Sequence, residues 1–261
     1  GNGVRIRLLW SPSTKDILSE IELEKDSLAL IFLGGVHYFS GRVFDMKAIT
    51  DAGHSVGSKV GFDLAHGTGN IPLRLHDWNV DFAAWCSYKY LNGGPGCIAG
   101  IFVHEKYHND QTLPRFAGWW GHDKKSRFDM PSQFEHIPGA EGWQCSNPPI
   151  FPLASLRASM EIFQSAGMEA LREKSTSLTA YLSFLLSELP LEIITPLSNQ
   201  ERGCQLSLRM KKDGKSVFRK LTESGFIVDW REPDVIRVAP VPLYNSYYEV
   251  WEFAEKLKSL V

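Results

Sequence analysis

An acidic and a basic side chain each follow an apolar stretch in the N-terminal half of this 261-residue chain. Asp63 comes at the end of the run VGFD, and Lys89 follows the run DFAAWCSY and precedes a glycine-rich turn. Such runs are typical of buried strands, and ligands of an open α/β sheet bind at its carboxyl edge, where both side chains would lie. The sequence therefore predicts one site that contains Asp63 and Lys89.

A lysine and an acid placed in this way suit pyridoxal-phosphate chemistry. A lysine acts as a covalent catalyst by forming a Schiff base with a carbonyl, and pyridoxal phosphate commonly supplies that carbonyl. The site also needs an acid beside the ring nitrogen, because a negative charge keeps that nitrogen protonated. Gly93, Gly94 and Gly96 would let the backbone pass close to a bulky cofactor. By spacing alone, an ordinary edge aspartate and a surface lysine fit equally well.

Several longer motifs surround this pair and follow one another in a fixed order. The longest is VGFDLAHGTGNIPLRLHDWNVDFAAWCSYKYLNGGPGCIAGIFVHEKY, preceded by GGVHYFSGRVFDM. The later motifs are FAGWWGHDKKSRFDM, GWQCSNPPI, ERGCQL and IRVAPVPLYNS. Together they resemble kynureninase, a family of pyridoxal-phosphate hydrolases with the aspartate-aminotransferase superfold. The resemblance runs from about Asp16 to the C-terminus and covers nearly the whole chain.

The resemblance assigns roles to seven side chains. In that family the lysine of SYKY holds the cofactor, the tyrosine before it binds the phosphate, and the aspartate and histidine of DLAH lie against the ring. A tryptophan and an asparagine complete the pocket from the neighbouring subunit, which implies a homodimer with shared sites, and an arginine would bind the substrate carboxylate through a bidentate pair. In this sequence these residues are Lys89, Tyr88, Asp63, His66, Trp119, Asn147 and Arg237. We expect Lys89, Asp63 and Tyr88 to be the catalytic residues. Loop packing for Trp119 and Asn147, and a surface ion pair for Arg237, are the alternatives that involve no site.

The activity that the resemblance implies is hydrolysis of L-kynurenine or 3-hydroxy-L-kynurenine to anthranilate or 3-hydroxyanthranilate and L-alanine, with pyridoxal 5'-phosphate as cofactor. The sequence departs from the family in two ways. Gly34 stands where related enzymes often have a cofactor-side serine. The family's N-terminal part, which carries further residues of the cofactor and substrate pockets, has no counterpart here, so the activity of the isolated chain is in question. Another enzyme of the same fold, such as a cysteine desulfurase or an aminotransferase, and a non-catalytic fragment that dimerises both remain alternatives.

Composition and charge exclude several other classes of function. The net charge is -2 with both signs mixed, which gives no electrostatic reason to expect nucleic acid or a membrane surface as partner. The longest apolar run, residues 28–33, is too short to cross a bilayer. The four cysteines lack CxxC or framework spacing, as in reduced cytosolic proteins, so we expect a soluble, cytoplasmic protein.

The periodicity of apolar residues predicts an α/β fold with a small α+β domain over residues 151–261. The resemblance implies that residues 1–150 are part of a fold-type-I large domain, with a mostly parallel sheet and helices. A strand–helix–strand unit at 28–63 predicts a parallel pair of strands. Leu153, Leu156, Met160 and Phe163, continued by a second stripe at 171–185, are expected to form a core face. Helices are expected at 16–25, 46–58, 216–224 and 247–260, and strands at 28–33, 59–63, 81–88, 97–104, 191–195, 205–210, 226–230 and 236–241.

Two motifs and one segment need separate interpretation. The sequence HEKYH at 104–108 matches the H-E-x-x-H zinc pattern, but its first histidine ends a predicted strand and no third ligand is evident, so we predict no metal. The glycine run 93–100 lacks the Lys-Ser/Thr of a phosphate-binding P-loop. Residues 106–149 show no periodicity and are rich in Trp, His, Gly and Pro, which is typical of a functional loop that covers a ligand or a partner.

Overall fold

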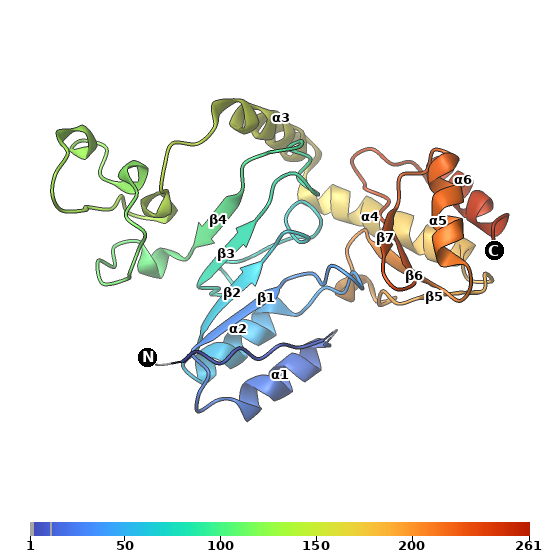
Figure 1. The fold of residues 1–261 in the computed structure, drawn as a ribbon, viewed down its shortest axis with the longest axis horizontal. Helices are drawn as coiled ribbons and strands as arrows, with labels where there is room; N and C mark the ends of the chain where they lie inside the picture. The colour runs from blue at the N-terminus through green and yellow to red at the C-terminus, as the bar shows by residue number, and fades with distance from the viewer. Residues whose placement is uncertain (1–2, 11) are drawn as a thin grey trace.

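The computed structural model describes residues 3–10 and 12–261, and its strands form two separate sheets (Figure 1). The strands of the first sheet are β1 (Leu30–Gly34), β2 (Lys59–Asp63), β3 (Phe82–Trp85) and β4 (Gly100–Val103). They lie in the order β1-β2-β3-β4; the first three are parallel and β4 is antiparallel. The mostly parallel sheet predicted from the strand–helix–strand unit is therefore confirmed. The carboxyl ends of β1, β2 and β3 meet at one edge of this sheet.

Two helices pack beside this sheet and close its core. Helix α2 (Met46–Ser55) connects β1 to β2 and packs against β2, and α1 (Thr14–Leu23) packs against α2. Helix α1 begins at a capping box, in which the side chains of Ser13 and Asp16 accept each other's backbone N–H groups. Ile17 of α1 is almost completely buried in a core that also contains apolar residues of α2, β1 and β2. Burial of this one apolar face holds the helices against the sheet.

The segment between β4 and α3 contains only short 3₁₀ turns. In Figure 1 it extends away from the first sheet, on the side opposite to the C-terminal half of the chain. Its exposed aromatic side chains include Phe116 and Phe128. The turns are Glu105–Tyr107, Trp119–Gly121, Arg127–Asp129 and Ala140–Trp143.

Helices α3 (Ile150–Ala166) and α4 (Met168–Leu185) follow, separated by Gly167 in a left-handed conformation with φ of 77°. The apolar stripe of α4 is buried as expected. The prediction that the stripe of α3 forms a core face is confirmed for Phe163, which is buried, and for Leu156, which packs against the same cluster. It is wrong for Leu153 and Met160, which are 42% and 47% exposed. The buried side of α3 packs against Leu91 in the first half of the chain.

The second sheet has the order β5-β6-β8-β7, with every neighbouring pair antiparallel. Its core is shared with α4, α5 and α6 and includes Leu182, Leu208 and Ile236. The predicted strand at 226–230 is wrong in its start, because the extended pairing begins only at Asp229. The elements are β5 (Leu191–Ile193), β6 (Leu206–Met210), α5 (Gly214–Glu223), β7 (Asp229–Arg231), β8 (Val235–Val238) and α6 (Tyr247–Lys258).

Hydrogen bonds join the two halves at the loop after β1. Thr195 donates its hydroxyl to the Ser40 carbonyl at 2.6 Å, and the Gln205 amide donates to the Tyr38 carbonyl at 3.1 Å. The loop therefore contacts both sheets. The two sheets have separate cores, whereas the predicted domain boundary near Phe151 stays a prediction. Among the residues that the structure describes, no helix is both long enough and apolar enough to cross a membrane.

Candidate functional site

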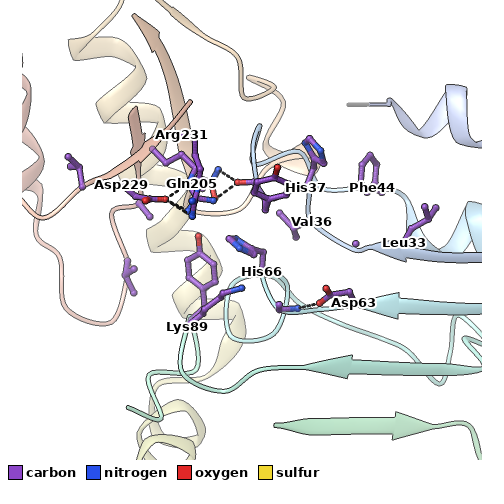
Figure 2. A pocket seen from close by; sticks show the side chains of 18 of the residues that line it. Leu33, Val36, His37, Phe44, Asp63, His66, Lys89, Gln205, Asp229 and Arg231 are labelled. Atoms are coloured by element: carbon purple, nitrogen blue, oxygen red, sulfur yellow. Dashed lines mark hydrogen bonds and ion pairs between the residues drawn. The ribbon is translucent and has the colours of Figure 1, made fainter. Parts of the chain in front are cut away.

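A cleft of about 840 Å³ opens between the carboxyl edge of the first sheet and the second sheet. Four of the seven predicted site residues line it: Asp63, His66, Lys89 and Arg237. Figure 2 shows Asp63, His66 and Lys89 on the side of the first sheet, with Asp229 and Arg231 across from them. Side chains that are 174 residues apart in the sequence, from Asp63 to Arg237, thus face one cavity.

Asp63 is the last residue of β2 and extends from the sheet edge into the cleft. Its Oδ1 accepts the backbone N–H of Ala65 at 2.8 Å, which orients the carboxylate at the end of the strand. The second carboxylate oxygen carries most of the remaining acceptor capacity. Asp63 can therefore bind a protonated group that enters the cleft.

Lys89 lies in the turn after β3, which packs against the turn after β2. The turn is closed by the N–H of Gly93, which donates to the Ser87 carbonyl at 2.9 Å. Gly69, with φ of 79°, lies so close that a Cβ there would approach the Tyr90 carbonyl oxygen to 2.7 Å. Only glycine permits this approach, which brings the turn after β2 against the turn of Lys89.

His66 contributes a buried nitrogen that lacks a protein partner. Its Nδ1 is buried and has no hydrogen-bond partner among the residues that the structure describes. Burial and, second, the nearby Lys89 ammonium lower the pKa of His66 to about 4, so its imidazole is neutral at pH 7. The ring of Tyr90 meets it edge to face at 5.7 Å between centroids. A buried polar atom left unpaired is costly, and here it points to a ligand in the cleft.

Arg237 on β8 faces the same cavity from the second sheet, with its side chain 12% exposed. Its Nε donates to Asp229 Oδ2 at 2.7 Å and its Nη2 donates to the same oxygen. Its Nη1 donates to the Tyr38 carbonyl at 2.6 Å. Arg237 is therefore held between β7 and the loop after β1, and its guanidinium gives the cleft a fixed cation.

The other three predicted residues do not line the cleft. Tyr88 is 53% exposed, and the ammonium of Lys89 lies 5.9 Å from its ring centroid. Trp119 is 48% exposed and packs edge to face on Trp120 and Phe128. Asn147 is exposed. Their roles in a site stay predictions.

The structure adds lining residues that sequence reasoning missed. Tyr38, Gln205 and Asp229 lie in the cleft, and Asp229 contacts Arg237 directly. Asp229 and Arg237 are opposite each other in the antiparallel pair of β7 and β8. The sequence does not give the register of this pair, and that register was the information needed to find Asp229.

Metal ligands and thiols do not gather in this cleft. Within residues 3–10 and 12–261, no cluster of three or more His, Cys, Asp or Glu side chains could hold a metal ion. His104 and His108 flank a three-residue 3₁₀ turn, and His108 Nε2 lies 3.3 Å from the Val103 carbonyl. The four cysteines are unpaired and none lines the cleft.

Comparison with solved structures identifies the fold. A cysteine desulfurase from Escherichia coli matches with a TM-score of 0.77 at 18% identity, over 94% of this chain and 62% of that chain. An alanine–glyoxylate aminotransferase from Nostoc matches with a TM-score of 0.71 at 19% identity, over 95% and 65%. At these identities the likeness shows the fold alone. It confirms the predicted α/β fold, which cysteine desulfurases and aminotransferases share.

Comparison of sequences finds similarity to one family of enzymes. Residues 171–257 match the model of the kynureninase C-terminal domain. The chain is 56% identical to a kynureninase from Flavobacterium psychrophilum, over 94% of this chain and 59% of that protein. It is 52% identical to a kynureninase from Mus musculus, over 95% and 55%. The chain thus spans somewhat more than half the length of these relatives, and over that span it is similar to kynureninases.

Proposed function

We propose that this chain is part of a kynureninase, which hydrolyses L-kynurenine or 3-hydroxy-L-kynurenine with pyridoxal 5'-phosphate as cofactor. The observation that carries the proposal is the meeting of Lys89, Asp63, His66 and Arg237 in one cleft. These groups suit the cofactor: an amine for its aldehyde, a carboxylate for its ring nitrogen, and a buried imidazole nitrogen that lacks a partner. We expect Tyr88 to bind its phosphate.

When bound, the cofactor would supply an electron-accepting ring that stabilises negative charge formed on the substrate. Lys89 would hold it covalently through Nζ, and the carboxylate of Asp63 would keep the ring nitrogen protonated. The Nζ of Lys89, as a free amine, would be the base that takes the proton from the substrate Cα. Arg237 would bind the substrate α-carboxylate and fix the Cα near Lys89. The reaction consumes one water: the Cβ–Cγ bond breaks, the γ-carbon gains the hydroxyl and the Cβ gains a proton.

The alternatives of the same fold have less support. A cysteine desulfurase needs a thiol at the substrate, and none of the four cysteines lines the cleft. The likeness to cysteine desulfurases and aminotransferases extends to fold only, whereas sequence identity to kynureninases is above 50%. Lys89, Asp63 and Arg237 together also argue against a role limited to dimerisation.

A pyridoxal-phosphate titration of the purified chain tests the proposal. We expect a visible absorption band that saturates with cofactor and is abolished by Lys89→Ala. Lys47→Ala is the matched control, because Lys47 is exposed and pairs with Asp51 on α2 away from the cleft. The loaded chain should then release fluorescent anthranilate from L-kynurenine. A band that persists in Lys89→Ala, with an unchanged fold, would contradict the assignment of Lys89.

We further propose a homodimer in which Trp119 and Asn147 complete the site of the neighbouring subunit. Both are exposed and do not line the cleft of their own chain. Apolar side chains around them are exposed as well, including Phe116 at 91% and Phe151 at 89%, and such a patch is typical of an interface. A second copy of the chain would bury these side chains.

Subunit mixing tests this assembly alongside sedimentation equilibrium. If the site is shared, a mixed dimer of Lys89→Ala and Asn147→Ala has one intact site. Statistical mixing then restores about a quarter of the wild-type sites. If Asn147 acts in its own subunit, mixing restores nothing, and the shared-site proposal fails. A chain that sediments as a monomer would equally contradict it.

For the location in the cell we propose the cytoplasm. The support is chemical: all four cysteines are unpaired, as expected in a reducing compartment. Fractionation of cells that express the full-length protein tests it, and recovery in a membrane or secreted fraction would contradict it.

A further inference from the structure

The guanidinium of Arg237 is held along one edge by a carboxylate on the adjacent strand. Asp229 of β7 and Arg237 of β8 are register partners in an antiparallel pair, so their side chains lie on the same face of the sheet. The Nε and Nη2 of Arg237 both donate to Asp229 Oδ2. The Tyr38 carbonyl accepts from Nη1 at 2.6 Å and also from the Gln205 amide. Two elements from different halves of the chain therefore fix this one side chain.

A count of donors shows what the arrangement leaves available. A guanidinium has five N–H groups, and the bonds formed among the described residues use three of them. The two that remain are one on Nη1 and one on Nη2. A carboxylate takes two N–H groups of one guanidinium in a bidentate pair. Asp229 occupies Nε and one N–H of Nη2, and it leaves the second N–H of Nη2 for a ligand.

The local charge also permits an anionic ligand. Arg231 Nη2 lies 3.0 Å from the same oxygen of Asp229, and Arg231 lines the cleft as well. Two guanidinium groups and one carboxylate give this wall a net charge of about +1. Asp229 therefore orients the arginines without cancelling their attraction for a carboxylate.

We propose that Asp229 is a positioning residue, which directs the free N–H pair of Arg237 toward the α-carboxylate of the amino-acid substrate. This inference rests on the proposed function, in which Arg237 binds that carboxylate. The opposite role is a competitor: an Asp229 that occupies Arg237 would have to be displaced by the ligand. The two roles predict opposite effects of Asp229→Asn on affinity.

The test compares two ligands on the chain loaded with pyridoxal phosphate. L-alanine, a product of the proposed reaction, carries the α-carboxylate, and ethylamine lacks it. Dissociation constants are measured from the change in the visible band for the wild type, Asp229→Asn and Glu192→Gln. Glu192 is the matched control, because it forms the same kind of cross-strand pair with Arg209 at 3.0 Å in the same sheet, outside the cleft. The thermal midpoint of each variant shows whether it is folded.

We expect Asp229→Asn to weaken L-alanine binding on the order of tenfold, the loss expected for one charge-assisted contact, with ethylamine binding unchanged. Glu192→Gln should change neither constant. With L-kynurenine as substrate, Asp229→Asn should raise KM by a similar factor and leave kcat within about twofold. A merely structural role would weaken both ligands and lower kcat together.

Each other outcome overturns the inference in a distinguishable way. If the wild type prefers L-alanine and Asp229→Asn binds it equally well, positioning fails while the proposed function stands. Tighter L-alanine binding in the variant would make Asp229 a competitor. If the wild type shows no preference for L-alanine, Arg237 does not bind the carboxylate, and the proposed role of Arg237 fails together with that of Asp229.

Discussion

Gly34 and Asp63 lie directly opposite each other at the carboxyl ends of β1 and β2, and both line the cleft. The residue at position 34 is thus the cross-strand neighbour of the carboxylate that we assign to the cofactor ring. Gly34 has no side chain, so it offers the cofactor no hydrogen bond. A side chain introduced at this position would lie beside Asp63.

The first prediction concerns the replacement Gly34→Ser. A Cβ at position 34 would come 3.3 Å from the Val36 carbonyl oxygen, a tight contact that a small shift relieves, and the backbone there does not need glycine. We expect the variant to fold and to bind pyridoxal phosphate about three- to tenfold more tightly, the effect of one added hydrogen bond. The cofactor titration measures this. Gly34→Ala separates the hydroxyl from the Cβ, and an equal gain in Gly34→Ala would exclude the hydrogen bond as the cause.

A second prediction follows from the hydrogen bond that the side chain of Asp63 accepts. The Ala65 N–H donates to Asp63 Oδ1 at 2.8 Å. In Asp63→Asn the amide oxygen can still accept this N–H, so the turn after β2 should stay intact. The negative charge that we propose keeps the ring nitrogen protonated would be lost. We expect cofactor binding to persist while turnover of L-kynurenine falls on the order of a hundredfold or more. Steady-state kinetics together with the cofactor titration measure both effects, and an unchanged kcat would contradict the role of Asp63.

The bounds of a strand were predicted best where consecutive buried residues are followed by an exposed polar residue. The strand at residues 59–63 was predicted with its observed bounds, because its three central residues are buried and its two end residues are exposed and charged. The strand containing Asp229 was predicted three residues too early, at 226. Ile227 is 99% exposed, so the apolar run there reflects the rim of the cleft, not a strand. Local pattern does not distinguish these two causes of an apolar run.

The candidate site was predictable in part for a similar reason. Asp63 ends β2 and Lys89 lies in the turn that follows β3, so the parallel order of these strands brings both residues to one edge. Arg237 belongs to the second sheet, and its place in the same cleft depends on how the loop after β1 joins the two halves through the Tyr38 carbonyl. No local pattern predicts such a contact between segments 199 residues apart. The family resemblance supplied Arg237, whereas Asp229 needed the structure.

A third prediction concerns a buried acid remote from the cleft. The side chain of Asp81 is 3% exposed, and it accepts hydrogen bonds from Tyr107 at 2.5 Å, Val60 N–H at 2.6 Å and His54 at 2.9 Å, with Lys106 at 2.8 Å. Burial alone would raise the pKa of Asp81, but the contacts with Lys106, Tyr107 and His54 together hold it well below its usual range. We expect Asp81→Asn to lower the free energy of unfolding by about 2–4 kcal/mol, because it leaves a partly buried lysine without its counter-charge.

Urea denaturation measures this loss, with Asp51→Asn as control. Asp51 forms an exposed pair with Lys47, so its loss should cost less than about 0.5 kcal/mol. The stabilisation by Asp81 should be complete above its ordinary pKa of 3.8 and should decline as the pH falls further. Equal losses in the two variants would show that the Asp81 network contributes no more than a surface pair.

The last prediction is a pH dependence caused by His66. Its pKa is lowered to about 4 in the folded chain from an ordinary value of 6.5, because burial and the Lys89 ammonium disfavour the imidazolium. Above pH 6.5 both the folded and the unfolded states are neutral at this position. Between pH 6.5 and 4 only the unfolded state binds the proton, so acidification favours unfolding by at most about 3 kcal/mol. Urea unfolding of the cofactor-free chain at pH 7, 6, 5 and 4 measures the decline.

His66→Asn should reduce this decline, since it removes the group that titrates. His76→Asn is the control, because His76 is exposed and its pKa is raised by the hydrogen bonds that it donates to the carboxylates of Glu105 and Asp77, so it has no part in an acid-induced loss of stability. Bound cofactor should make the free energy of unfolding of the wild type fall more steeply with decreasing pH. The reason is that a ligand that contacts the buried Nδ1 of His66 needs the neutral imidazole. The same pH profile for the wild type and His66→Asn would mean that His66 titrates normally in the folded chain, and the case for a ligand at its buried nitrogen would lose its electrostatic support.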